Sequence, residues 1–154
     1  MIYFFPNIFS KKEEFPYNVN KFKINDLNKS YKLILNNSHT NFHLIDVLTD
    51  KKTIEISQIR QMINYANKSA FNNRERIVLI DNAENLNLNS LNALLKIVEE
   101  PNENIIFIII FDNNKKIHST LNSRCLKFNL FLTFDQSIDT VNTIIEKNVY
   151  DLIS

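Results

Sequence analysis

Two residues carry the clearest chemistry in the sequence: Asp81, at the end of an apolar run, and Arg124, between a serine and a cysteine. Ile77–Ile80 is wholly apolar, as in a strand covered on both faces, and it leads directly into Asp81. A carboxylate there could hold Mg²⁺ on the phosphates of a nucleotide. Hydrolysis also needs an acid beside it to orient water, and Asn82 offers only an amide. The pattern alone leaves Asp81 open as a magnesium ligand or as the polar end of a strand.

The absence of glycine limits the chemistry further. The chain has 154 residues and no glycine, where an average usage of about 7% would give roughly ten. A P-loop or a dinucleotide fingerprint needs glycines so that backbone N–H groups can wrap a phosphate closely. The sequence therefore excludes a phosphate-binding loop of either kind.

Charge and composition exclude several other classes of protein. The 18 basic and 17 acidic residues give a net charge of +1, which excludes a strongly basic arm that would hold nucleic acid by charge alone. One cysteine cannot form a disulfide framework and fits a reducing compartment. No apolar run approaches the length of a membrane span, and Met1–Phe15 has no basic segment before its apolar residues. We predict a cytoplasmic protein with no membrane segment.

The hydrophobic pattern predicts alternating strands and helices from Asn41 onward, whereas residues 1–40 are mixed in composition and are expected to be irregular to helical. We expect strands at 41–48, 76–80, 104–111 and 125–132, and helices at 56–70, 88–100, around 115–123 and at 135–153. Ser57 is a candidate N-cap for the first of these helices, and Asn87 or Asn89 for the second.

The order of these elements predicts an α/β fold with an open, mostly parallel sheet flanked by helices. The strand, helix and strand of residues 76–111 form a βαβ unit, whose two strands should be parallel. We expect 104–111 to be buried on both faces and 125–132 to be a half-exposed or edge strand. Asp81 and Asp112 should lie at the carboxyl ends of the strands, where such sheets bind ligands.

Four blocks of the sequence together resemble the AAA+ module of bacterial sliding-clamp loaders. They are the Walker-B-like strand Ile77–Asp81, the helix Asn92–Pro101 ("NALLKIVEEP"), Ser123–Cys125 ("SRC") and, more weakly, Ile54–Ile63 ("IEISQIRQMI"). The resemblance covers about Asn41–Leu132. Among clamp-loader subunits it is greatest to the delta-prime type of DNA polymerase III, whose ATP motifs are commonly degenerate.

The resemblance implies a role in trans for Arg124. The arginine of the family's SRC motif reaches the ATP γ-phosphate held by a neighbouring subunit, and a guanidinium suits this because its planar fork can bridge two phosphate oxygens. Ser123 and Cys125 would position that arginine. Without the family, Arg124 would be interpreted as an ordinary surface or salt-bridged arginine, and Cys125 as a buried small hydrophobe.

Departures from the family's pattern imply that this chain does not hydrolyse ATP. It has no Walker A lysine, Asn82 replaces the second acid of Walker B, and Phe111 and Asp112 stand where an active loader has a sensor threonine. Asp81 would be an inactive Walker B remnant. With one cysteine the zinc site of some delta-prime subunits is absent, so we expect neither metal nor cofactor.

The implied function is a non-hydrolysing delta-prime-like subunit of the loader that places the sliding clamp on primer–template DNA. Its partners would be gamma/tau-type and delta-type subunits, and the ATP would belong to a neighbour. The chain would have no catalytic activity alone and would be an accessory subunit of the polymerase holoenzyme. Two alternatives stay open: a gamma/tau-type ATPase whose P-loop half is missing, or a non-functional AAA+ fragment or interaction domain.

The family's arrangement also gives expected domain bounds. Residues 1–132 would be a partial AAA+ core, poorly defined over 1–40, and 133–154 the start of a helical lid. A fragment or a shortened gene is expected, because the P-loop segment and the collar domain have no counterpart.

Other candidate residues have simpler interpretations. We expect Glu84 to be an exposed loop acid. His39 and His43 are four apart, but they lack an intervening Glu and lie beside a predicted strand, so solvated or core histidines are favoured over metal ligands. The pairs Lys51–Lys52 and Lys115–Lys116 could contact a DNA backbone but are typical of solvated loops.

Overall fold

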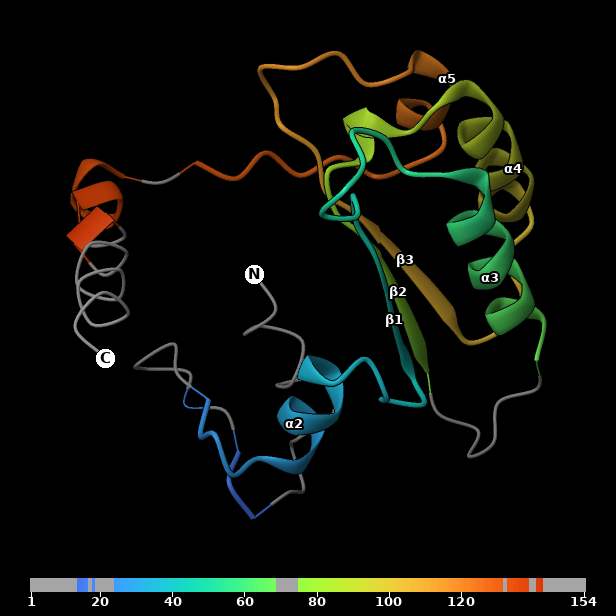
Figure 1. Ribbon diagram of the computed structural model, residues 1–154. Helices are drawn as coiled ribbons and strands as arrows, with labels where there is room; N and C mark the ends of the chain where they lie inside the picture. Colours follow the sequence, from blue (N-terminus) through green and yellow to red (C-terminus); the bar gives the residue numbers. More distant parts are fainter. Residues whose placement is uncertain are drawn as a thin grey trace. The chain divides into compact units, whose positions relative to one another are not determined.

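The computed structural model describes residues 14–16, 18, 24–68, 75–131, 133–138 and 141–142 (Figure 1). The chain divides into two units, Met1–Arg124 and Cys125–Ser154, and each is considered by itself. Most of residues 1–23 lie outside the described part. The predicted boundary between the core and the lid at residue 133 stays a prediction.

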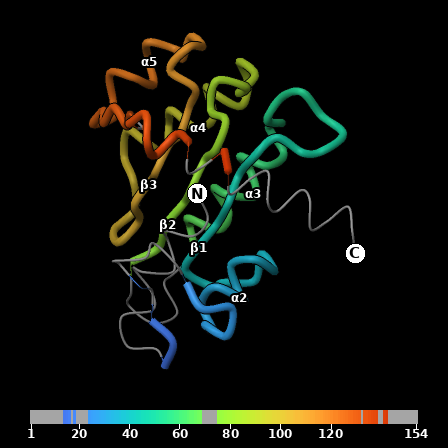
Figure 2. The backbone as a smooth tube through the Cα atoms, turned by 90° about the vertical axis from the view of Figure 1, so that its left-hand side faces the viewer, coloured from blue at the N-terminus to red at the C-terminus, as the bar shows by residue number. Residues whose placement is uncertain are grey.

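The centre of the first unit is a three-stranded parallel sheet. Its strands are β1 (Phe42–Ile45), β2 (Arg76–Ile80) and β3 (Ile105–Ile109), in the spatial order β1-β2-β3. Ile77 pairs with Phe42 on one side and with Ile106 on the other. Figure 2 shows the strands side by side with β2 in the middle. The predicted α/β class, the parallel sheet and the βαβ unit are confirmed.

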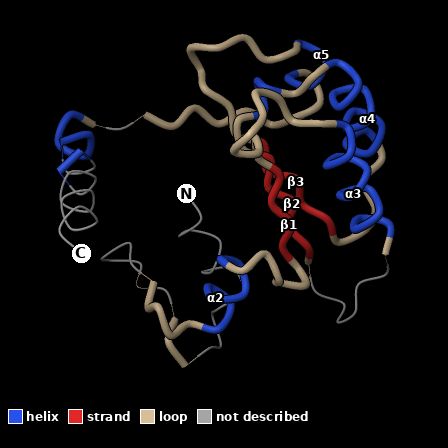
Figure 3. The backbone as a smooth tube through the Cα atoms, in the orientation of Figure 1, coloured by secondary structure: helices blue, strands red, loops and turns tan. Residues whose placement is uncertain are grey.

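Helices cover both faces of this sheet (Figure 3). The helices α3 (Ile56–Asn67) and α4 (Leu88–Glu99) pack against each other on one face, and α2 (Lys29–Leu35) lies on the other. Ile34 of α2 packs with Phe42, Ile77 and Leu79 in one core cluster. All five residues of β2 are buried, as expected for a strand covered on both faces.

The helix ends show which polar side chains satisfy the backbone. Asn87 caps α4, because its Oδ1 accepts a hydrogen bond from the Ser90 N–H at 2.9 Å. One of the two caps predicted for this helix is thereby confirmed. The predicted cap of α3, Ser57, is wrong. Glu55 occupies that position, and its N–H donates to Oε1 of Gln58 at 2.9 Å, as in a capping box.

Strand β3 is less buried than its composition predicts. We expected a strand covered on both faces, yet Ile106 is 43% exposed and its four neighbours in the strand are only half-buried. The physical reason is position: β3 lies at the end of the described sheet, whereas the cluster around Ile34 is centred on β1 and β2. An apolar run identifies a strand but does not place it within the sheet.

The expected strand at 125–132 does not form in the described residues 125–131. Leu126, Phe128 and Leu130 alternate as in an edge strand, but their side chains are 88%, 81% and 89% exposed. Alternation becomes a strand only when a neighbour supplies backbone hydrogen bonds, and no described strand pairs with this segment. Further on, residues 134–138 and 141–142 are helical, so the described helix begins one residue before the helix predicted at 135–153, and the rest of that prediction lies outside the described residues.

The buried Arg76 ties the start of β2 to the end of α3. Its Nη1 donates to the carbonyl oxygens of Tyr65 at 3.0 Å and Lys68 at 2.6 Å, and its Nη2 donates to that of Ala66 at 3.2 Å. The guanidinium also lies 5.7 Å from the centre of the Tyr65 ring. The last turn of α3 has no basic residue of its own, so Arg76 supplies the positive charge that favours a helix C-terminus.

Replacing Arg76 tests this contact. Arg76→Met should lower the free energy of unfolding by about 2–4 kcal/mol, because buried carbonyls at the end of α3 lose charged donors. Arg60→Met, at an exposed position of the same helix, is the matched control and should change stability by less than about 0.5 kcal/mol. Urea unfolding followed by circular dichroism measures both. Equal stability of the two variants would contradict the role of Arg76.

Candidate functional site

Asp81 lies where the sequence predicts it, directly after β2 at the carboxyl end of the sheet. Its backbone N–H donates to the carbonyl of Ile45, the last residue of β1, at 2.9 Å. Its carboxylate Oδ1 accepts a hydrogen bond from the N–H of Asn82 at 2.9 Å. Asp81 therefore lies directly after the central strand at the carboxyl end of the sheet, where it is half-buried, and its interpretation as a Walker B remnant stays a prediction.

Asn82 uses its side chain to join the ends of two strands. Its Nδ2 donates to Oδ1 of Asp46 at 2.8 Å, and Asp46 directly follows β1. The backbone of Asn82 is left-handed, with φ of 52°, a conformation that asparagine tolerates better than most residues. An amide held in this way is not a base and cannot activate a water molecule. The side chain of Asn82 therefore links the ends of β1 and β2, at a position where a nucleotide hydrolase would need an acid.

Sequence analysis missed Asp46, although a signal for it existed. Asp46 follows β1 as Asp81 follows β2, and residues directly after neighbouring parallel strands meet at one edge of the sheet. The Asp46 Oδ1 that accepts from Asn82 also accepts a hydrogen bond from the backbone N–H of Val47, at 2.6 Å. Within the described part of the chain, no group of three or more His, Cys, Asp or Glu could hold a metal ion.

The prediction that Glu84 is an exposed loop acid is wrong. Its side chain is 2% exposed, and Oε1 forms an ion pair with Nζ of Lys115 at 3.0 Å. Oε2 accepts the N–H of Asp112 at 3.3 Å. Glu84 lies in the short 3-10 turn η1 (Ala83–Asn85), so this carboxylate ties the turn after Asp81 to the loop after β3. Sequence distance hides the contact, because the two segments are about thirty residues apart.

Burial by itself raises the pKa of Glu84, but hydrogen bonds to its carboxylate outweigh burial and hold the pKa below its ordinary value. The donors are its own backbone N–H, the Lys115 ammonium and the backbone N–H of Asp112. A carboxyl whose pKa is lowered on folding stabilises the fold when it is ionised. This stabilisation is complete at neutral pH and is lost as the pH falls through the lowered pKa.

Arg124 lies at the end of the first unit, just beyond the short helix α5 (Ser119–Asn122). Its Nε donates to Oε1 of Glu99 at 2.6 Å, and Nη2 lies 2.5 Å from the same oxygen. Its Nη1 donates to the carbonyl oxygen of Thr120 at 2.7 Å. The side chain of Arg124 is 35% exposed, so the guanidinium is held in place and still reaches solvent.

Ser123 and Cys125 flank the arginine differently. Ser123 donates its hydroxyl to the Thr120 carbonyl at 3.0 Å, so it shares an acceptor with Arg124. Cys125 is half-buried, less than the buried hydrophobe expected from the sequence, and burial raises the pKa of its thiol. A raised pKa keeps the thiol protonated and argues against a nucleophilic role. The supporting role of Ser123 and Cys125 stays a prediction.

The two histidines considered as metal ligands have other contacts. His43 lies in β1, not on a helix, and stacks on Tyr65 with ring centres 5.1 Å apart. Burial lowers its pKa and so favours the neutral ring. His39 accepts the Asn41 N–H on Nδ1 at 3.2 Å.

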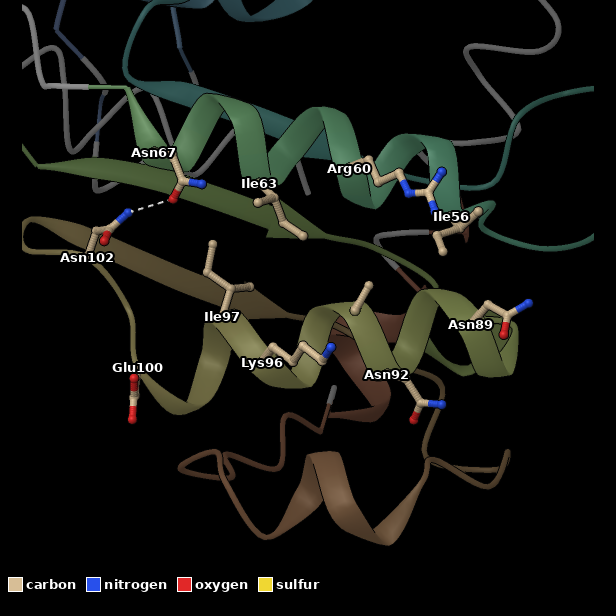
Figure 4. Close-up of a pocket in the computed structure, with 11 residues that line it drawn as sticks. Ile56, Arg60, Ile63, Asn67, Asn89, Asn92, Lys96, Ile97, Glu100 and Asn102 are labelled. Atoms are coloured by element: carbon tan, nitrogen blue, oxygen red, sulfur yellow. Dashed lines mark hydrogen bonds between the residues drawn. The ribbon is translucent and has the colours of Figure 1, made fainter.

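A groove of about 580 Å³ lies between α3 and α4 (Figure 4). Ile63 of α3 and Ile97 of α4 point into it, and Asn102 donates to Oδ1 of Asn67 across one end at 3.0 Å. The other lining residues are mostly polar: Ile56, Arg60, Asn89, Asn92, Ala93, Lys96 and Glu100. Glu100 is the one acid among the lining residues, and none of them is Ser, Thr, Cys or His, so the groove offers no constellation for hydrolysis.

Comparison with models of known protein families shows which family the chain belongs to. The family described as DNA polymerase III, delta subunit, matches residues 15–133, which include Asp81, Glu99 and Arg124. The chain belongs to this family. Among the described residues, no helix has the length and apolar character that a membrane crossing requires.

Relatives within the DNA polymerase III group are both delta-prime and gamma subunits. The chain is 34% identical over 124 residues to the DNA polymerase III subunit delta' of Buchnera aphidicola subsp. Schizaphis graminum, covering 80% of this chain and 37% of that one. It is 39% identical over 95 residues to the gamma subunit of the same organism, covering 61% of this chain and 25% of that one. The chain therefore spans little more than a third of the delta' relative.

A solved structure supports the fold of the family. A DNA polymerase III gamma subunit-related protein of Thermotoga maritima superimposes with a TM-score of 0.54 at 19% identity. The match covers 68% of this chain and 37% of that one. At this identity the likeness supports the fold alone.

The contact of Glu84 can be tested by its pH dependence. Glu84→Gln should lower the free energy of unfolding by about 1 kcal/mol at neutral pH, because charge-assisted hydrogen bonds are lost. The difference from the unmodified chain should begin to shrink below the ordinary pKa of a glutamic acid, about 4.3, and should disappear as the pH falls through the lowered pKa of Glu84, where the folded carboxyl becomes protonated. The matched control is Glu103→Gln, at an exposed position before β3. Denaturant unfolding over a pH series measures both, and a difference independent of pH would contradict the assignment.

Proposed function

We propose that this chain is a delta-prime-like subunit of the DNA polymerase III clamp loader that does not hydrolyse ATP itself. It lends Arg124 to ATP bound by a neighbouring gamma/tau-type subunit. Family membership supports the loader role. Delta-type subunits are further partners in the loader, and the sliding clamp and primer–template DNA are contacted through the assembled loader in the cytoplasm.

The observation that carries the proposal is the state of the Arg124 guanidinium. The side chain of Arg124 is 35% exposed and Glu99 binds one edge of its guanidinium, so the group is neither buried in the core nor free to point in any direction. A guanidinium keeps its charge at all physiological pH values and can donate two parallel hydrogen bonds to phosphate oxygens. Placed against the γ-phosphate of a neighbour, it would stabilise the charge that develops as the phosphoryl group transfers.

The residues at the carboxyl end of the sheet support the proposal that this chain does not hydrolyse ATP. Asn82 stands where the second acid would be, and its amide holds Asp46. Glu84, the next acid along the chain, is bound to Lys115 and the Asp112 N–H. No glycine is available for a phosphate-binding loop. Asp81 alone could contact a metal ion but could not complete the reaction.

Removing Arg124 tests the role in trans. The loader is reconstituted with the gamma/tau-type subunits of the same cell. Arg124→Ala should abolish ATP hydrolysis at the adjacent subunit's site, because arginine fingers accelerate phosphoryl transfer by roughly 10³–10⁵. Lys29→Ala, which removes an exposed positive charge on α2, is the control and should leave the rate unchanged. Clamp-stimulated phosphate release gives the rate, and gel filtration shows whether the loader assembles. An unchanged ATPase in a correctly assembled Arg124→Ala loader would contradict the role.

A gamma-type ATPase is the second candidate, favoured by the 39% identity to a gamma subunit. Phosphate release by the isolated chain tests the gamma-type function in one direction only, because the phosphate-binding loop that a gamma-type ATPase needs has no counterpart in this sequence. We expect phosphate release from Mg-ATP to stay at background, and Asp81→Asn to change nothing, because no acid is available to activate water. Release above background that Asp81→Asn abolishes would favour the gamma-type function.

A further inference from the structure

Glu99 makes an unusual contact for a residue at the end of a helix. It is the last residue of α4, and Pro101 follows two positions later. One carboxylate oxygen, Oε1, accepts from Nε of Arg124 at 2.6 Å and lies 2.5 Å from Nη2. The edge of the guanidinium formed by Nε and Nη2 is thereby bound by Glu99, which comes from α4, whereas Arg124 lies just beyond α5.

The Thr120 carbonyl fixes a second point of the same group. It lies 2.7 Å from Nη1 of Arg124 and also accepts the Ser123 hydroxyl. A planar group held at two points has its orientation determined. These contacts use three of the five N–H donors of the guanidinium, which leaves two for a ligand approaching from solvent.

The ion pair between Arg124 and Glu99 is partly exposed, so its main effect is on the orientation of the guanidinium and not on stability. The side chains of Arg124 and Glu99 are 35% and 46% exposed, and ion pairs of this kind contribute little to stability. Their geometric effect is larger, because an unrestrained arginine samples many rotamers. Catalytic groups that are oriented in advance lose less entropy when the transition state forms.

We propose that Glu99 is a positioning residue for Arg124, which holds the guanidinium so that its two remaining donors face a phosphate on a neighbouring subunit. The inference rests on the proposed function of Arg124 and adds to it the residue that sets its direction. Glu99 does not touch the nucleotide; it acts through Arg124.

Substitution of Glu99 by glutamine tests the proposal with little change in shape. Glu99→Gln keeps an oxygen acceptor but removes the charge. The matched control is Glu100→Gln, the same change one residue further on, where the side chain lines the groove between α3 and α4. Each full-length variant is assembled into the loader in excess, so that weakened assembly does not limit the rate.

Single-turnover phosphate release is the measurement. The phase that Arg124→Ala removes is the finger-dependent phase. Glu99→Gln should slow this phase by about tenfold, the lower end of what loss of an orienting partner costs, with KM for ATP changed less than about twofold. Glu100→Gln should leave the phase unchanged. A structural role would lower the amount of assembled loader and would not slow the phase once assembly is complete.

The double variant shows whether Glu99 acts through Arg124. Adding Glu99→Gln to Arg124→Ala should cause no further loss, because a positioning residue has nothing left to position. A further loss, or an unchanged finger-dependent phase in Glu99→Gln, would overturn the role of Glu99 and leave that of Arg124 intact. Absence of any finger-dependent phase, with Arg124→Ala equal to the unmodified chain, would overturn both.

Discussion

The complete burial of β2 is the constraint on which the rest of the first unit depends. Because β2 lies between β1 and β3 and is covered by helices on both faces, the residues at its two ends have fixed places. At the start, Arg76 reaches the carbonyls that end α3. At the finish, Asp81 and Asn82 lie against the end of β1. The same strand thus orders a helix terminus and the edge of the sheet where a nucleotide hydrolase would work.

Local pattern predicted the three strands of the sheet and the helices α3, α4 and α5 in their order, but neither the bounds of α2 nor the contacts between distant segments. The apolar run of β2 and the helical spacing of apolar residues in α4 are visible in the sequence alone. Asn87, one of the two expected caps, caps α4. The burial of Glu84 depends on Lys115, which no short window contains. The exposure of Ile106 depends on where β3 lies in the sheet, and a strand at 125–131 would need a partner strand. These are tertiary effects, and periodicity carries no information about them.

The candidate site was predicted in part for the same reason. Asp81 and Arg124 were selected as candidates from a strand end and from a motif, and their functional roles stay predictions. Their surroundings come from elsewhere in the chain: Asp46 follows β1, and Glu99 ends α4. The surroundings separate the two residues chemically. Asp81 lies beside Asn82, whose amide is hydrogen-bonded to Asp46, whereas Arg124 is held by Glu99 and partly exposed.

The most direct test of the account is the structure of the reconstituted loader with a non-hydrolysable ATP analogue, determined by electron cryo-microscopy. The account predicts the Arg124 guanidinium within hydrogen-bond distance of the γ-phosphate on a neighbouring subunit, and no nucleotide at the Asp81 end of this chain. A nucleotide bound beside Asp81, or a neighbour's γ-phosphate contacted by another residue while Arg124 points away, would contradict it.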